Sequence, residues 1–229
     1  MNFVIPAGVL LISYLLGSIP TGLIIVKVFA GKDVRQVASG RTGGTNAMRA
    51  AGFWAGLGTA TLDLLKSAAA VWIALAAAPG NPWLHVFAPL AAILGHNYSI
   101  FMLERGERGQ LRLRGGAGGA PTAGGAIGLW PISIFIIVPV GALILYFVGY
   151  ASLATLSIGL VATVIFAVRA WSGASPWQYV FYGLLAEILL FVALRSNIQR
   201  LANGTERLVG FRTRKKKEQR EFEESRKTG

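Results

Sequence analysis

The sequence contains no cysteine and only two histidines among its 229 residues. The chain therefore has no disulfide framework, no thiolate nucleophile and no cysteine-ligated metal site. Acidic residues are scarce as well, with ten Asp and Glu against 22 Lys and Arg. The patterns of phosphate-binding P-loops, zinc metalloproteases and serine hydrolases are missing. We therefore expect no metal and no cofactor.

What the sequence has in abundance is apolar residues. They make up 54% of the chain, charged residues make up only 14%, and the mean hydropathy is +0.56. This composition is typical of an integral membrane protein rather than a soluble domain. The long apolar segments are 3–29, 53–78, 83–103, 117–148, 153–168 and 177–194.

The segment 117–148 is too long for one span, since it would measure about 48 Å as a helix against a hydrocarbon core of about 30 Å. A break at Trp130-Pro131 would divide it into two helices, because proline lacks the N–H group that a continuing helix needs. The sequence thus predicts an all-α, polytopic membrane protein with seven transmembrane helices.

Orientation follows from the distribution of Lys and Arg, which concentrate in cytoplasmic loops. The segments 27–49 and 105–114 are rich in cations, the turn 79–82 has none, and eleven of the 22 cations lie from Arg195 onward. Seven spans place all three basic regions in the cytoplasm and the amino terminus outside. We expect a membrane domain over 1–211 and a charged cytoplasmic tail over 212–229. Because the basic excess belongs to loops and a tail, we expect no nucleic-acid partner.

Three stretches on the predicted cytoplasmic side combine glycine or asparagine with arginine: ASGRTGGTNAMRAAG at 38–52, RLRGGAGGAPTAGG at 112–125 and NIQRLANGTE at 197–206. Glycine lets the backbone approach a ligand closely, and arginine matches phosphate oxygens, so together they indicate an anion site. Glycine-rich membrane segments are also common helix-packing surfaces, which remains the competing interpretation for the second stretch.

Charges inside the predicted spans need a separate explanation, since each is costly in lipid. Asp63 and Lys66 are three residues apart and share a helix face, which favours a buried structural pair. Glu187 has no local partner, so it is either an interhelical partner of a cation or an acid of unknown use.

The order of these motifs resembles that of the acyl-phosphate glycerol-3-phosphate acyltransferases (the PlsY type). SGRTGGTNAMR is similar to the first motif of that family, SGNxGATNxxR, and RGGAGGAPT is similar to its KGGKGVAT. LDLLKS, GHNYSIF and NIQRLANGTE resemble DxxKG, GHxFPxF and HxxNIxRLxxGxE. Matches in the first motif fall at Ser39, Gly40, Gly43, Thr45, Asn46 and Arg49.

The chain departs from the family pattern at several positions. Arg41 replaces an Asn, Ala117 stands where a Lys is expected, and Leu194 stands where a His is expected. About five extra residues within ERGERGQLR lengthen the loop before the glycine-rich motif. We expect Arg49 to lie at the membrane entrance in a low dielectric, and Arg41 to lie nearer water.

The resemblance implies transfer of a fatty acyl group from acyl phosphate to the sn-1 hydroxyl of glycerol 3-phosphate, at the cytoplasmic face of a bacterial inner membrane. Membrane lipid and other phospholipid-synthesis enzymes are the further partners that it suggests. The catalytic residues it implies are Ser39, Asn46, Arg49 and Asn197. The substrate-binding residues it implies are Gly40, Gly43, Thr45, His96, Arg114, Gly115, Gly116, Gly118 and Glu206.

Two other functions stay open at this point. A catalytically silent or altered-substrate paralogue would fit the changes at Ala117 and Leu194. A transporter or binder of an organophosphate or an anionic lipid would use the same anion site without chemistry, although no repeat between the two halves is visible. If the polar stretches form one site, their residues must border a single cavity open to the cytoplasm and to lipid.

Overall fold

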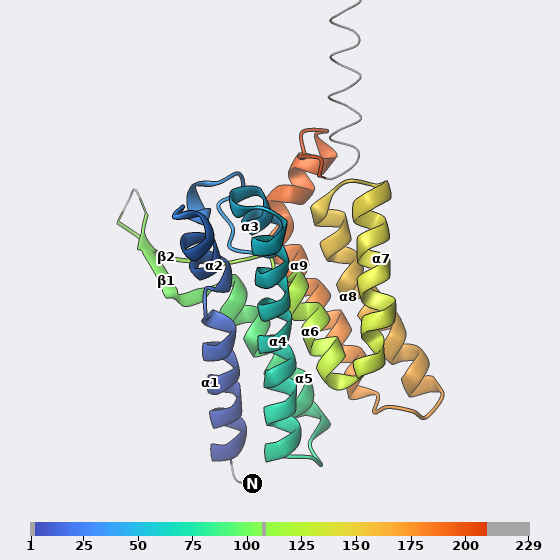
Figure 1. The fold of residues 1–229 in the computed structure, drawn as a ribbon. Helices are drawn as coiled ribbons and strands as arrows, with labels where there is room; N and C mark the ends of the chain where they lie inside the picture. Colours follow the sequence, from blue (N-terminus) through green and yellow to red (C-terminus); the bar gives the residue numbers. More distant parts are fainter. Residues whose placement is uncertain (1–2, 107–108, 210–229) are drawn as a thin grey trace, which may run out of the picture.

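The computed structural model describes residues 3–106 and 109–209, in which helices run between the end that carries the amino terminus and the opposite end (Figure 1). The predicted tail over 212–229 lies outside the described residues. The elements in chain order are α1 Val4–Ser18, α2 Thr21–Ala30, a 3-10 turn Val34–Gln36, α3 Gly44–Ala51, α4 Phe53–Ala77, α5 Pro82–Asn97, β1 Ser99–Arg105, β2 Leu111–Arg114, α6 Gly119–Leu129, a 3-10 turn Pro131–Ser133, α7 Ile134–Phe147, α8 Ala151–Trp171 and α9 Gln178–Ala202.

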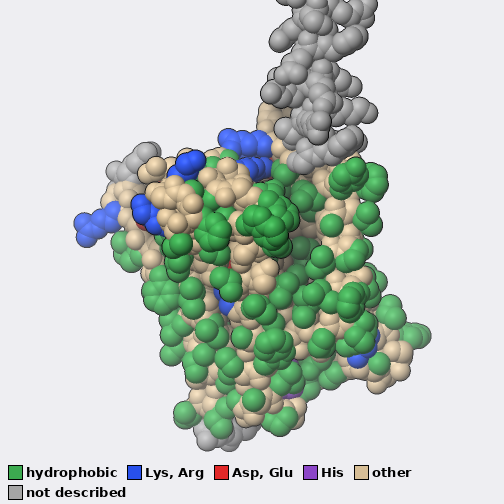
Figure 2. Space-filling view, in the orientation of Figure 1, with side chains coloured by type: hydrophobic (Ala, Val, Ile, Leu, Met, Phe, Trp, Pro, Cys, Tyr) green, Lys and Arg blue, Asp and Glu red, His purple; other side chains and the backbone are tan. Residues whose placement is uncertain are grey.

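Within the described residues, four stretches are long and apolar enough to cross a membrane: Val4–Ala30, Phe53–Ala77, Ala151–Trp171 and Gln178–Ala202. Pro131–Phe147 is a shorter apolar helix. Apolar side chains cover the flank of the molecule, and most Lys and Arg on the visible face gather at the end opposite the amino terminus (Figure 2). A membrane protein is therefore confirmed, while the count of seven spans and the orientation of the termini stay predictions.

The expected first span, 3–29, is not one continuous helix. α1 ends at Ser18 and α2 begins at Thr21, with Ile19 and Pro20 between them. Proline restricts the residue before it to extended backbone and has no N–H group to continue the helical ladder. The break leaves the Ile19 carbonyl free to accept a hydrogen bond from Lys66 Nζ at 3.1 Å.

The predicted break at Trp130-Pro131 is confirmed. α6 ends at Leu129, Trp130 has extended backbone, and a 3-10 turn leads into α7. The physical cause is again the residue preceding a proline, which avoids helical backbone. The chain therefore reverses direction here, and α6 and α7 form two separate helices in place of one long helix (Figure 1).

The all-α prediction is wrong for the segment after α5. α5 ends at Asn97 rather than continuing to Leu103, and β1 pairs with β2 as an antiparallel hairpin that projects from the side of the bundle (Figure 1). Leu103 pairs with Leu113 and Glu104 with Arg112. Apolar and charged residues alternate along Leu111–Arg114, a period of two that suits a strand and not a helix.

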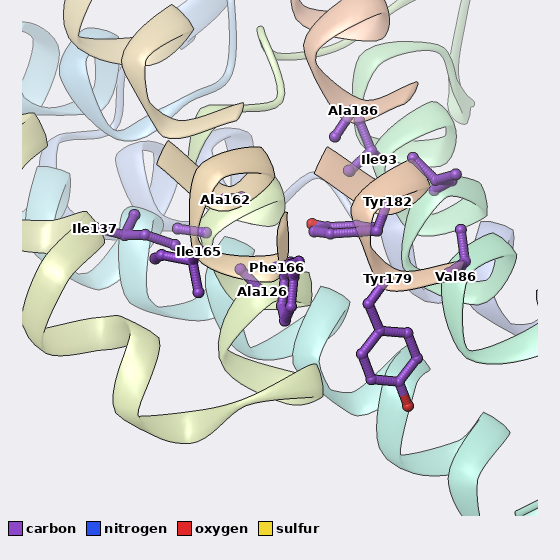
Figure 3. Packing of buried hydrophobic residues seen from close by; sticks show 12 residues of the cluster. Val86, Ile93, Ala126, Ile137, Ala162, Ile165, Phe166, Tyr179, Tyr182 and Ala186 are labelled. Atoms are coloured by element: carbon purple, nitrogen blue, oxygen red, sulfur yellow. The ribbon is translucent and has the colours of Figure 1, made fainter. Parts of the chain in front are cut away.

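The main core lies among α5, α6, α7, α8 and α9, where Phe166 and Tyr182 are fully buried (Figure 3). The Tyr182 hydroxyl donates a 2.6 Å hydrogen bond to the Thr122 carbonyl. A Cβ on Gly124 would lie 2.0 Å from the Leu64 carbonyl oxygen, so glycine there lets α6 approach α4 closely. The second glycine-rich stretch is thus partly a packing surface, as its competing interpretation expected.

Glu187 lies on α9 and packs against Gly159 of α8. A Cβ added to Gly159 would lie only 2.2 Å from Glu187 Oε2. Within the described ranges it forms no ion pair, and Oε2 has no hydrogen-bond partner. We expected Glu187 to be either an interhelical partner of a cation or an acid of unknown use. Among the described residues, the first of these expectations is wrong.

Candidate active site

Asp63 forms a buried hub that joins three helices. Its Oδ1 accepts a 2.5 Å hydrogen bond from Thr21 Oγ1 at the start of α2, and lies 2.8 Å from Lys66 Nζ on its own helix. The same oxygen lies 3.3 Å from His96 Nδ1 at the end of α5. A buried carboxylate needs such partners because its charge is poorly stabilised in an apolar interior. The predicted pairing of Asp63 with Lys66 is present, and it fixes the position of His96.

The glycine-rich segment rests directly on His96. The Gly116 N–H donates a 2.9 Å hydrogen bond to the His96 carbonyl, and a Cβ on Gly116 would lie 1.9 Å from His96 Nε2. A Cβ on Gly115 would lie 2.1 Å from the same carbonyl oxygen. These approaches require glycine at both positions, since a real Cβ does not come so near another heavy atom. His96, Gly115 and Gly116 therefore lie together, and the substrate-binding role that the resemblance implies for them stays a prediction.

Gly118 marks the start of α6 and has a positive φ of 91°. A Cβ there would lie 2.9 Å from Asn97 Oδ1, and both polar side-chain atoms of Asn97 are buried with no hydrogen-bond partner in the described chain. Buried amides are normally hydrogen-bonded, so the Asn97 side chain still has hydrogen-bonding capacity that a ligand could use. The sequence analysis missed it.

Asn46 organises the loop between α2 and α3, residues 31–43, which we call the first loop. Its Nδ2 donates to the carbonyls of Val34, Val37 and Arg41 at 3.1, 2.9 and 2.8 Å. The amide N–H groups therefore bind the protein's own backbone, and the catalytic role that the resemblance implies for Asn46 stays a prediction. Asn46 holds the loop in shape.

Ser39, by contrast, is exposed at the turn of the loop, where its Oγ accepts from the Arg41 N–H at 3.4 Å. Gly43 precedes α3, and a Cβ there would meet nothing within 4 Å. Thr45, in the first turn of α3, is half-buried. These positions are open enough to receive a ligand, but their roles stay predictions.

The first loop and the glycine-rich segment meet at the basic end of the molecule. The Thr42 N–H donates to the Gly115 carbonyl at 3.4 Å, and a Cβ on Gly40 would lie 3.5 Å from Arg114 Nη1. Arg114 Nε in turn forms a 2.8 Å ion pair with Glu104 Oε2 of the hairpin. Two of the three predicted stretches therefore form one surface.

Glu104 was missed by the sequence analysis, although acidic residues among the arginines of ERGERGQLRLR were a visible signal. It pairs with Arg114 through Oε2 and with Arg35 Nη1 through Oε1 at 2.7 Å. Arg35 also pairs with Asp33 at 2.7 Å, and this guanidinium holds the pKa of the Asp33 carboxyl below its ordinary value of 3.8. The hairpin is thereby tied to the first loop.

The third stretch closes on itself at the end of α9. Asn197 Nδ2 donates to Glu206 Oε1 at 2.8 Å, and Arg200 Nε binds Glu206 Oε2 at 2.9 Å. The Glu206 side chain is only 5% exposed, so both of its oxygens are satisfied by protein groups. The expected structural ion pair of Glu206 is therefore present. Asn197 Oδ1 remains buried with no partner among the described residues.

The expected environments of Arg41 and Arg49 are reversed. Arg49 lies on the outer face of α3 and is exposed, whereas Arg41 precedes that helix, is half-buried, and donates from Nη2 to the Ala193 carbonyl of α9. Burial lowers the pKa of the Arg41 guanidinium, and the nearby positive charge of Arg200 lowers it further. The environment of Arg41 differs from the expectation because α9 packs over the loop, a contact that the local sequence does not reveal.

The chain resembles known proteins along most of its length. The family model described as glycerol-3-phosphate acyltransferase matches residues 7–204. Glycerol-3-phosphate acyltransferase 2 of Moorella thermoacetica is 36% identical over 206 residues, which cover 89% of this chain and 97% of that protein. Glycerol-3-phosphate acyltransferase of Thermus thermophilus is 35% identical over 203 residues, which cover 89% of this chain and 94% of that protein.

The fold is similar to crystal structures of PlsY, an integral membrane glycerol 3-phosphate acyltransferase. The glycerol 3-phosphate form matches with a TM-score of 0.77 and 31% identity, over 90% of this chain and 96% of that one. The lysophosphatidic acid form matches with a TM-score of 0.76 and 29% identity, over 90% and 95%.

Proposed function

Because the chain belongs to the glycerol-3-phosphate acyltransferase family, we propose that it transfers a fatty acyl group from acyl phosphate to the sn-1 hydroxyl of glycerol 3-phosphate. The observation that carries the proposal is the junction of the first loop with the glycine-rich segment. There the Thr42 N–H donates to the Gly115 carbonyl beside the side chain of Arg114. Glycine backbone and guanidinium groups suit phosphate, which both substrates carry.

The proposed reaction needs no nucleophile from the protein. The sn-1 hydroxyl oxygen attacks the acyl carbon of the mixed anhydride, the bond from that carbon to the phosphate oxygen breaks, and an ester forms. The hydroxyl proton goes to the departing phosphate, so the products are lysophosphatidic acid and inorganic phosphate. Catalysis then rests on positioning and on stabilising charge. The scarcity of histidine and the complete lack of cysteine agree with such a mechanism.

Residue roles follow from the arrangement. We assign Arg49 and the hydroxyl of Ser39 to acyl phosphate, since Ser39 on the first loop and Arg49 on α3 are both exposed. Arg114, with the backbone of Gly115, Gly116 and Gly118, holds glycerol 3-phosphate. Asn197 presents its unpartnered Oδ1 to the glycerol hydroxyls.

The remaining predicted residues support those that bind substrate. Asn46 shapes the loop, His96 supports the glycine-rich segment, and Glu206 orients Asn197. Gly40, Gly43 and Thr45 keep the loop open for the acyl phosphate headgroup.

The direct test is an assay of the detergent-purified full chain with acyl phosphate and glycerol 3-phosphate. Release of phosphate, with lysophosphatidic acid identified by mass spectrometry and the acyl position assigned by NMR, would support donor and position. Acyl-CoA and acyl carrier protein thioesters serve as comparison donors. Turnover with a thioester alone would refute the donor, and a 2-acyl product would refute the position.

We further propose seven spans, with the basic end and the site in the cytoplasm of a bacterial cell and the tail beyond residue 211 on the same side. Because the chain contains no cysteine, single-cysteine variants report location cleanly. Gly80→Cys probes the turn before α5, and Arg105→Cys probes the hairpin. A membrane-impermeant maleimide should label the first in intact cells and the second only after the inner membrane is opened. The reverse pattern would refute the orientation.

A further inference from the structure

Arg41 lies where all three polar stretches meet. Its backbone is adjacent to Thr42, whose N–H donates to Gly115 of the glycine-rich segment. Its side chain crosses to α9 and donates to the Ala193 carbonyl, one turn before Asn197. The charged side chains that act on the Arg41 guanidinium are Arg200 and Glu206. No other side chain links the first loop directly to α9 among the hydrogen bonds and ion pairs of the described residues.

The ion pairs at this end leave Arg41 without a carboxylate. Arg35 and Arg114 pair with Glu104, and Arg200 pairs with Glu206. In residues 3–106 and 109–209, Arg41 forms no ion pair, and its hydrogen bond goes to a neutral carbonyl. Glu206, the acid whose charge acts on Arg41, already binds Asn197 with one oxygen and Arg200 with the other.

A half-buried cation in this state is costly, because burial removes water and supplies no opposite charge. The lowered pKa of the Arg41 guanidinium reflects that cost. Arg49, the other arginine of this polar stretch, has the more exposed side chain, although burial lowers the pKa of its guanidinium as well. The environment of Arg41 is therefore one that an arriving anion would stabilise.

The glycine-rich segment, residues 115–129, lacks a cation of its own. Between Gly115 and Leu129 it carries no charged side chain, and Ala117 lies in its middle. Its neighbouring cation, Arg114, is already partly neutralised by Glu104. Backbone N–H groups alone bind phosphate less strongly than N–H groups assisted by a full charge.

We propose that Arg41 is a substrate-binding residue, whose guanidinium binds the phosphate group of a substrate against the glycine-rich segment. This inference rests on the proposed function. The planar guanidinium of Arg41 has N–H groups besides the one that binds Ala193. It can therefore contact a phosphate while keeping its hydrogen bond to the Ala193 carbonyl of α9. Substrate binding would then connect the first loop, the glycine-rich segment and α9 through one side chain.

The test compares Arg41→Ala, Arg41→Lys and the control Arg105→Ala, which removes an exposed hairpin arginine at the same end. Initial rates are measured while each substrate is varied separately. Arg41→Ala should raise the KM of one phosphate-bearing substrate by about tenfold to a hundredfold, the range for a charge-assisted hydrogen bond. The substrate with the raised KM identifies the bound phosphate. Arg41→Lys should fall between, and Arg105→Ala should match the unaltered enzyme.

Two further measurements separate binding from structure. Guanidinium chloride at millimolar concentration should partly restore the activity of Arg41→Ala and leave the activity of Arg105→Ala unchanged. Calorimetry with glycerol 3-phosphate or inorganic phosphate should show weaker binding to Arg41→Ala if either occupies the site. Unchanged KM values for both substrates, or a loss of thermal stability as the sole effect, would overturn the inference.

The outcome also distinguishes this inference from the proposed function. If the unaltered enzyme uses acyl phosphate and Arg41→Ala keeps both KM values, only the role of Arg41 fails. If the unaltered enzyme rejects acyl phosphate, the proposed donor fails, while calorimetry with glycerol 3-phosphate and kinetics with the active donor still decide the role of Arg41.

Discussion

Replacing Gly116 with alanine would place a methyl group against the ring of His96. The new Cβ would lie 1.9 Å from Nε2, 2.6 Å from Cε1 and 2.8 Å from Cδ2. The ring would have to move by about 1.5 Å to restore ordinary van der Waals contact. It is not free to do so, because Nδ1 lies 3.3 Å from the buried Asp63 carboxylate and the His96 carbonyl binds the Gly116 N–H.

The cost of Gly116→Ala follows from these restraints. Overpacking a rigid site typically costs about 1–3 kcal/mol. The protein can relieve the clash by moving the ring away from Asp63 or by lifting the glycine-rich segment away from α5. Either movement displaces the backbone that we assign to glycerol 3-phosphate. We expect kcat/KM to fall by at least about tenfold, since a displacement near 1 Å in a positioned site can cost about a hundredfold.

The assay is initial-rate phosphate release together with thermal unfolding of the purified protein. Gly58→Ala is the matched control, because its Cβ would meet only Ile25 Cδ1 at 3.6 Å, an ordinary contact. It should keep full activity and gain slightly in stability, since alanine favours a helix interior over glycine.

A double variant tests the cause directly. In a His96→Ala background the ring is gone, so adding Gly116→Ala should cost much less stability than it does alone. Equal costs in both backgrounds would refute the clash. Full activity in Gly116→Ala would refute the placement of substrate on this segment.

Three other predictions concern the same end of the molecule. Arg49→Ala should lower acyl transfer by at least about tenfold and flatten its salt dependence, because an exposed guanidinium acts through a screened field until phosphate binds it; an unchanged salt profile would contradict this. Glu206→Ala should lower stability by about 1–3 kcal/mol in thermal unfolding, since it leaves Arg200 and a buried amide without their acceptor, whereas Glu206→Gln should lose less. Because Arg35 lowers the pKa of Asp33, that pair contributes stability fully above pH 3.8 and loses it as pH falls through the lower folded value; Asp33→Asn should remove this part of the acid dependence, and identical acid unfolding of the two proteins would contradict it.

Much of the fold was predictable because it depends on local composition. Long apolar runs give helices that lipid can surround, and Pro131 sets the end of α6 through its missing N–H group. Pro20 carries the same signal, but the apolar run around it concealed the break between α1 and α2. The hairpin was missed because its strands are short and begin inside an apolar run that also suits a helix.

The sequence by itself determined the class of protein, the motifs and the residues available for an anion site, because each follows from residue type and spacing along the chain. Only the tertiary structure decided how those residues divide their work. The Asn46 N–H groups bind the chain's own carbonyls, and Arg41 is half-buried because Ala193, 152 residues away along the chain, packs over it. Burial and partnership depend on which distant segments meet. They therefore decide that Arg41, rather than Arg49, is the half-buried arginine, and that it has no carboxylate partner among the described residues.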